Sequence, residues 1–176
     1  MNQVSMLING ERTMARDGAT FERRNPLDDT VASTAPAATV ADAQAAVHAA
    51  AAAFPAWSAM GPGERRALLN RAADALEEKD DAFALAMAAE TGASRLWADF
   101  NVKLAADGLR EAAAMITQIS GEVIPSDVPG SLALGVRQAA GVVLGIAPWN
   151  APVILGVRAI ALPLACGNTV VLKGSE

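Results

Sequence analysis

One asparagine lies where an apolar run gives way to a helical pattern, and its chemistry suits acyl transfer. Asn150 follows the apolar residues 142–146 and precedes Pro152, which can open a helix. A carboxamide there can donate an N–H to a developing oxyanion, and losing such a donor slows a reaction by about 10²- to 10³-fold. Asn150 can equally cap the helix, and Trp149 beside it is more often a core residue than a cofactor platform. The spacing alone leaves these alternatives open.

A lysine and a carboxylate follow the second apolar run, residues 170–172. Lys173 and Glu176 lie where a dinucleotide-binding fold carries the acidic residue that hydrogen-bonds a ribose diol. A carboxylate there also repels a 2′-phosphate, which favours NAD over NADP. A solvated pair of loop charges explains the same spacing. No G-x-G-x-x-G fingerprint follows the first run.

Arg158 is a charge within an otherwise apolar segment. Ala151, Leu155 and Arg158 share one helix face at spacings i, i+4 and i+7. On a face that borders a crevice, Arg158 would meet an anionic or hydroxylated substrate; elsewhere it would reach solvent or pair with an acidic residue. Cys166 has no nearby His or Lys, so we predict a buried structural thiol and not a nucleophile.

Two strands and the helix between them must position these groups. Residues 142–146 and 170–172 are almost continuously apolar, as in parallel strands buried on both faces. The helix starts after Pro152 and ends before Gly167. The pattern predicts a right-handed parallel βαβ crossover, whose strand ends form the edge where ligands bind in open α/β sheets. Two strands do not make a stable sheet, so the remaining strands must lie elsewhere.

The first 140 residues are predicted to be mostly helical. A hairpin turns at Asn9-Gly10, and residues 21–33 form a loop that leads into a short extended segment. Caps and breakers then delimit the helices, which we expect from the Thr39/Asp42 capping box to Phe54-Pro55, from Pro62 to Lys79, from there to Gly92, and from Ser94 to Ile119. Two short strands, 122–124 and 132–138, flank a turn rich in Pro and Gly.

Composition excludes several classes of function. The chain has 176 residues, 52% of them hydrophobic, and a net charge of −5 without a basic stripe, so we expect no nucleic-acid partner. Residues 151–166 are apolar but are too short and too interrupted to span a membrane, and no signal peptide is visible. One cysteine allows no internal disulfide. We therefore expect a soluble, cytoplasmic α/β protein, and we predict no metal site.

Taken together, the motifs resemble the NAD(P)-dependent aldehyde dehydrogenase superfamily. The resemblance covers nearly the whole chain and rests on LINGE, NPLDD, AFPAWSA, ERRALLNRAADALEE, ETG, VRQAAGVVLGIAPWNAP, LPLACGNTVVLK and SE. It implies a Rossmann-like cofactor-binding domain, here incomplete, made of residues 1–120 and 140–176. It also implies that residues 121–139 form a β-arm used to build a homodimer or homotetramer.

The resemblance assigns roles to the site residues. Asn150 matches the oxyanion-hole asparagine, and Lys173 and Glu176 match residues that contact the adenosine ribose of NAD. The strand end beside the cofactor matches Ile146, Ala147, Pro148 and Trp149. The implied reaction oxidises an aldehyde to an acid: a cysteine thiolate attacks the carbonyl, hydride passes to NAD, and water hydrolyses the thioester.

Two departures from the family pattern are informative. Ala151 replaces a frequent phenylalanine and, with Leu155, Arg158 and Trp97 as pocket residues, is similar to aromatic enzymes of the salicylaldehyde and vanillin type. The family's catalytic cysteine, its general-base glutamate and the whole catalytic domain would lie beyond Glu176. We therefore expect the isolated chain to be inactive. A non-catalytic assembly module and a CoA-acylating relative remain the alternatives.

Overall fold

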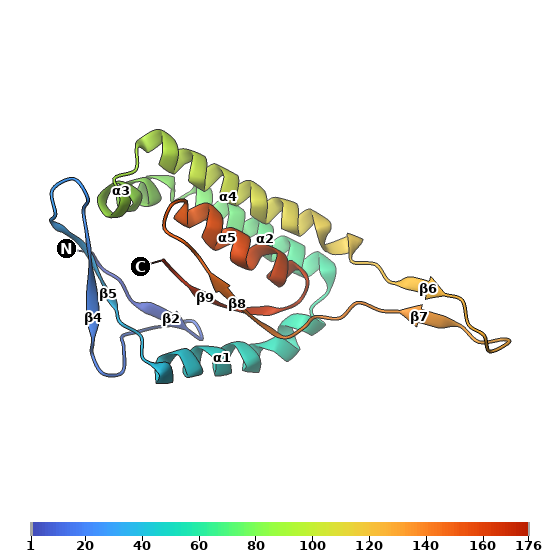
Figure 1. Ribbon diagram of the computed structural model, residues 1–176. Coiled ribbons are helices and arrows are strands. Elements are labelled where there is room, and N and C mark those ends of the chain that lie inside the picture. Colours follow the sequence, from blue (N-terminus) through green and yellow to red (C-terminus); the bar gives the residue numbers. More distant parts are fainter. Residues whose placement is uncertain (1, 176) are drawn as a thin grey trace.

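The computed structural model describes residues 2–175 and has an α/β architecture (Figure 1). A two-stranded parallel sheet has a group of packed helices on one side, and a single long helix lies along its other side, mainly against the second strand. In chain order the elements are β1 (Asn2–Gln3), β2 (Met6–Ile8), β3 (Glu11–Thr13), β4 (Thr20–Arg24), β5 (Val31–Pro36), α1 (Val40–Ala59), α2 (Pro62–Glu77), α3 (Asp80–Thr91), α4 (Arg95–Met115), the 3₁₀ turn η1 (Ile116–Gln118), β6 (Glu122–Ile124), β7 (Ala133–Gly135), β8 (Val142–Ile146), α5 (Pro152–Ala165) and β9 (Thr169–Lys173).

The N-terminal strands form two small sheets. The predicted hairpin is confirmed: β2 and β3 pair antiparallel, and Asn9 and Gly10 take positive φ values of 54° and 79° in its turn. The predicted loop over residues 21–33 is partly wrong, because β4 occupies residues 20–24 and pairs antiparallel with β5. The polar composition of β4 concealed it, since a strand at a sheet edge can alternate between solvent and a shallow core.

Local capping signals place the helix starts correctly. Thr39 and Asp42 form the predicted capping box of α1, and the Ser94 side chain accepts from the Trp97 N–H at the start of α4. The predicted end of α1 at Phe54-Pro55 is wrong, because the helix continues through Pro55 to Ala59. Trp57 donates its indole N–H to the Leu164 carbonyl at 3.1 Å, which fixes the last turn of α1 against α5.

The hydrophobic core lies between α2, α4 and α5, with α3 packed against α4. Its buried members are mostly alanines with a few larger residues such as Leu69, Leu109 and Ile116. Small side chains let helix axes approach closely, so the alanine content of the sequence is used for packing. Among residues 2–175, no helix combines the length and apolar character needed to cross a membrane.

The predicted crossover is present, since β8 and β9 pair in parallel with α5 between them. Gly145 faces α5 so closely that a Cβ added to it would lie 2.9 Å from the Ala159 Cβ. The predicted burial of both strand faces is wrong for β8: Val142, Leu144 and Ile146 are exposed, Leu144 by 63%. Residues 2–175 supply no layer to cover these side chains.

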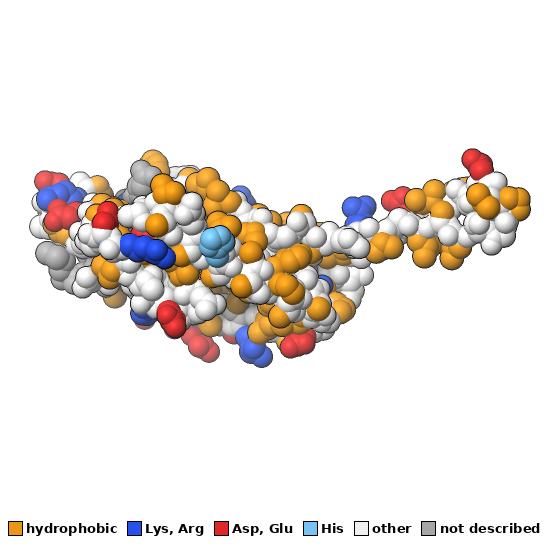
Figure 2. All heavy atoms as spheres, turned by 90° about the horizontal axis from the view of Figure 1, so that it is seen from below, with side chains coloured by type: hydrophobic (Ala, Val, Ile, Leu, Met, Phe, Trp, Pro, Cys, Tyr) orange, Lys and Arg blue, Asp and Glu red, His pale blue; other side chains and the backbone are white. Residues whose placement is uncertain are grey.

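The strands β6 and β7 form an antiparallel hairpin that projects from the body of the molecule (Figure 1). Hydrophobic side chains cover much of its surface (Figure 2). They include Val123, Val128, Leu132, Leu134 and Val136, all exposed.

Candidate active site

The ends of β8 and β9 form one edge of the parallel sheet. Ile146 pairs with Lys173 in the strand register, and the Ala147 N–H donates to the Lys173 carbonyl at 3.0 Å. The turn 148–151 then leads from β8 into α5. The crossover therefore places the residues that follow the two strands beside each other, at the edge where ligands bind in open α/β sheets.

Asn150 is exposed in this turn and does not cap α5. The N-cap residue of α5 is Ala151, and no side chain bonds to the first-turn N–H groups. No hydrogen bond to the Asn150 carboxamide is found among residues 2–175. The capping alternative is therefore wrong, and a carboxamide donor is available at the sheet edge.

The neighbouring predicted cofactor residues differ in exposure. Ile146, Pro148 and Trp149 are exposed, and Trp149 is 65% exposed, so it is not a core residue. Ala147 is buried beneath them. Lys173 is exposed at the end of β9, while Glu176 lies outside the described residues.

A groove with a volume of about 420 Å³ runs between α4 and α5. We call it the α4–α5 groove; its lining residues are Leu104, Ala105, Asp107, Gly108, Glu111, Ala112, Met115, Ile154, Val157, Arg158, Ala161 and Leu162. Arg158 therefore borders a cavity, as one of its two sequence interpretations required. Trp97, Ala151 and Leu155 do not line the groove, although Trp97 lies at the end of α4 that packs near the start of α5.

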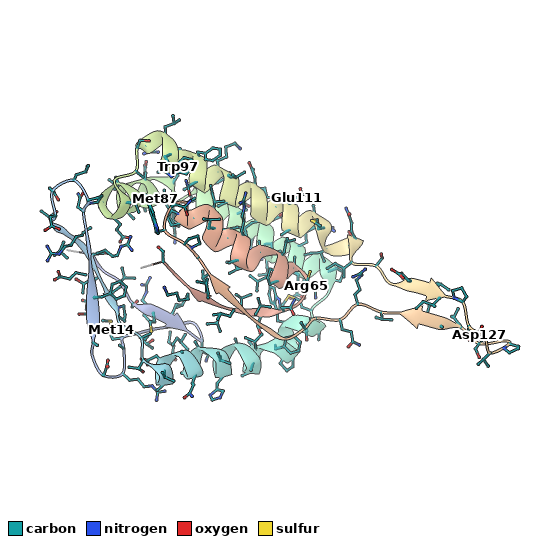
Figure 3. All side chains as sticks on the ribbon, in the orientation of Figure 1. Met14, Arg65, Met87, Trp97, Glu111 and Asp127 are labelled. Atoms are coloured by element: carbon teal, nitrogen blue, oxygen red, sulfur yellow. The ribbon has the colours of Figure 1, made fainter. Side chains whose placement is uncertain are left out.

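Helices α4 and α5 run in the same direction along the groove. Val153 belongs to the same buried cluster as Ala98 and Ala105, whereas Ala161 packs with Ala112 and its neighbours. The start of α5, with Ala151, is thus level with the start of α4, with Trp97. Figure 3 shows Trp97 near one end of α4 and Glu111 farther along it.

The start of α4 is fixed by an ionic cluster. Arg95 donates to Asp81 at 2.5 Å and to Asp99 at 2.6 Å, and it approaches Asp80 at 3.3 Å. Its hydrogen bonds to Asp81 and Asp99 raise the pKa of Arg95 above the ordinary range. Trp97 follows two residues later and stacks on Phe100, with ring centroids 5.5 Å apart.

Cys166 contradicts the sequence prediction, because its side chain is exposed. It lies one position past the buried Ala165, about 100° around the end of α5, and so points away from the core. The prediction that it is buried is wrong.

Three contributors were missed from the sequence. Asp107 and Glu111 line the α4–α5 groove, and the steps of four residues from Asp107 to Glu111 and from Glu111 to Met115 were a signal for a shared face. Asn168 fixes the crossover: its Oδ1 accepts from the N–H groups of Ala140 and Gly141 at 2.7 and 3.0 Å, and its Nδ2 donates to the Pro163 carbonyl. Within the described part of the chain, no group of His, Cys, Asp and Glu side chains has the arrangement of a metal site.

The chain is similar to several known proteins. Vanillin dehydrogenase of Pseudomonas sp. (strain HR199 / DSM 7063) is 64% identical over 176 residues, which are 100% of this chain and 36% of that protein. The crystal structure of a salicylaldehyde dehydrogenase from Pseudomonas putida G7, complexed with salicylaldehyde, has a TM-score of 0.97 and 47% identity, and the match covers 100% of this chain and 36% of that one. For an NAD-dependent benzaldehyde dehydrogenase from Corynebacterium glutamicum, the TM-score is 0.93, the identity 35%, and the covered shares 98% and 38%.

The chain spans about a third of the length of these relatives, 36% of the vanillin dehydrogenase. Residues 13–176 match the aldehyde dehydrogenase family. A family match over most of the chain and a relative of 64% identity lead to one conclusion: the chain belongs to the aldehyde dehydrogenase family.

Proposed function

We propose that this chain is the N-terminal part of an NAD-dependent enzyme that oxidises an aromatic aldehyde to a carboxylic acid. The observation that carries the proposal is the register of β8 and β9, which pairs Ile146 with Lys173 and so puts the turn containing Asn150 beside the end of β9. An oxyanion donor and a cofactor-facing lysine then share one sheet edge. Both side chains are exposed there, so neither packs in the hydrophobic core.

Asn150 is the catalytic residue in this proposal. Its Nδ2–H would donate to the oxyanion that forms when a nucleophile from outside residues 2–175 adds to the aldehyde carbonyl. No group among residues 2–175 accepts a hydrogen bond from this carboxamide, so its N–H donors are not used elsewhere in the described part of the chain. A donor placed before the reaction stabilises the oxyanion without the reorganisation that water would need.

The residues at the sheet edge fit the adenosine side of a dinucleotide. Trp149 and Pro148 are exposed at the end of β8, and Lys173 is exposed at the end of β9. A Cβ added to Gly174 would meet no atom within 4 Å, so the backbone after β9 is unobstructed. Bound there, the nicotinamide cofactor supplies the hydride acceptor. Our preference for NAD over NADP rests on the carboxylate of Glu176, which would repel a 2′-phosphate.

Three features support an aromatic aldehyde as the substrate. Ala151 is small where the chain enters α5, and Trp97 and Arg158 lie on the two helices that flank the α4–α5 groove. Leu155, one helical turn after Ala151 on α5, lies outside the groove. The relatives are named for vanillin, salicylaldehyde and benzaldehyde, which are all aromatic aldehydes.

The proposal also assigns a role to each segment of the chain. Residues 1–120 and 140–176 would form the first part of the cofactor-binding domain, with the rest of a Rossmann-like sheet added to β8 and β9. Residues 121–139 would be the arm of a homodimer or homotetramer, which the exposed apolar side chains of β6 and β7 support. The cytoplasm is the proposed location.

The test uses the product of the complete gene. Asn150→Ala should lower kcat for benzaldehyde oxidation by about 10²- to 10³-fold while leaving the Kd for NAD within about twofold. Lys173→Ala, the matched variant on the neighbouring strand end, should weaken NAD binding and leave kcat at saturating NAD nearly unchanged. Stopped-flow absorbance of NADH and fluorescence titration of NAD measure the two effects. An Asn150→Ala enzyme that keeps a third of its kcat would refute the assignment.

A further inference from the structure

The α4–α5 groove continues beyond Arg158, and a carboxylate, Glu111, lines this part of it. Gly108 lies level with Val157, since a Cβ added to it would be 3.9 Å from the Val157 Cγ1. Glu111 is three residues farther along α4, which is about 4.5 Å at the helical rise. The groove therefore presents first the apolar pair Leu104 and Ile154, then Arg158, then Glu111, and last the apolar residues Met115 and Leu162.

The charges on the groove are not equivalent. Asp107 is partly neutralised, because Lys103 and Arg110 approach its carboxylate at 3.4 and 3.9 Å. Glu111 and Arg158 make no hydrogen bond and no ion pair with any residue from 2 to 175. Both side chains line the groove and both are exposed, so each can interact electrostatically with a molecule bound in the groove.

Between these charges the groove is apolar. Ala105, Gly108, Ala112, Val157 and Ala161 form much of its surface, and no side chain there other than the three charged ones is ionised. A flat aromatic ring fits such a surface. A charged substituent on the ring would interact electrostatically with Arg158 and Glu111. Arg158 alone would attract any anion, including the carboxylic acid produced by the reaction.

We infer that Glu111 sets the substrate specificity of the groove by disfavouring anionic ring substituents, so that neutral hydroxyl-bearing aromatic aldehydes are selected over carboxylated ones. Glu111 offsets the attraction of Arg158 for carboxylates. A neutral phenolic hydroxyl still hydrogen-bonds to Arg158 without repulsion from Glu111. The same repulsion lowers the affinity for the acid product. This inference rests on the proposed function and deepens it.

The test compares two probes of the same shape in the complete enzyme: 4-formylbenzoate, which is anionic, and 4-formylbenzamide, which is neutral. Glu111→Gln should raise the ratio of kcat/KM for the benzoate to that for the benzamide by about fivefold, which corresponds to removing one repulsive charge from a partly wet groove. Glu64→Gln, which removes an exposed carboxylate of α2 outside the groove, should leave that ratio within about 1.5-fold.

A second measurement varies the salt concentration. In Glu111→Gln, where Arg158 is no longer offset, raising the salt concentration from about 0.05 M to about 0.5 M should lower the ratio of kcat/KM for the benzoate to that for the benzamide, whereas in the wild-type enzyme, where the two charges offset each other, the ratio should change less. If the benzamide is oxidised but neither the substitution nor salt changes the ratio, the inference is overturned and the proposed function stands. If neither aldehyde is oxidised and NAD does not bind, the proposed function itself fails.

Discussion

The helical core and the parallel sheet of this chain differ in how completely they bury their apolar side chains. Leu109 of α4 is 5% exposed, because α2 and α5 both pack against it. Leu144 of β8 has the same side chain and is 63% exposed. The helices bury one another's apolar faces within residues 2–175. A parallel strand, in contrast, is buried only when layers cover both of its faces and a strand pairs with each of its edges. The comparison shows which part of the molecule is well packed and which part leaves its apolar side chains exposed among the described residues.

The largest expected difference between the two regions is in stability. Leu109→Ala should lower the free energy of unfolding of the 176-residue chain by about 2–5 kcal/mol, because it leaves a cavity in the packed core. Leu144→Ala should change it by less than about 0.5 kcal/mol, since little contact is lost. Urea denaturation followed by circular dichroism measures both. Equal losses would mean that Leu144 is covered in solution, and the described difference in burial between the helical core and β8 would be wrong.

A second substitution probes the one face of β8 that is covered. Gly145→Ala places a methyl group 2.9 Å from the Ala159 Cβ and 3.3 Å from its carbonyl oxygen. This overpacking should cost about 1–3 kcal/mol. Gly156→Ala is the control on the opposing helix, where an added Cβ meets nothing within 4 Å, and it should stabilise the chain by up to about 1 kcal/mol. If Gly145→Ala is neutral by the same denaturation assay, α5 does not hold the sheet as closely as described.

The smallest effect concerns the junction of the N-terminal strands with α1. Hydrogen bonds from the Thr39 N–H and hydroxyl, with a lesser contribution from the Arg16 N–H, lower the pKa of Asp42 below its ordinary range. Because the folded-state pKa is depressed, the stabilisation is complete above the unfolded value of about 3.9 and is lost as the pH falls through the folded-state pKa. Asp42→Asn should remove this acid-side loss from the profile of stability against pH.

Thermal unfolding between about pH 2 and pH 6 measures this profile. Thr39→Ala leaves the backbone N–H in place, so it should flatten only part of the acid-side loss. An Asp42→Asn chain whose stability still falls as steeply as that of the wild type would assign the loss to other carboxylates.

Local chemistry in the sequence determined much of the fold. The Thr39/Asp42 box, Ser94 and the positive-φ glycine at Gly92 fixed helix boundaries because each side chain or backbone conformation acts within a few residues. The continuation of α1 past Pro55 was not predictable in this way. It depends on the hydrogen bond from Trp57 to Leu164, whose partners are 107 positions apart in the chain.

For the site, too, some features were predictable from the sequence and others were not. The types and spacing of Asn150 and Lys173, with the apolar runs before them, were enough to predict a shared sheet edge, whereas the ligand class of that edge stays a prediction. The sequence left open whether Asn150 caps α5, and it wrongly predicted that Cys166 is buried, because both depend on how the ends of α5 meet the rest of the molecule. Only the packing of α4 against α5 placed Glu111 beyond Arg158 on one groove. Local conformational preferences depend on neighbouring residues, so the sequence shows them directly. The burial of a side chain and the charges around it depend on segments that meet only after the chain has folded.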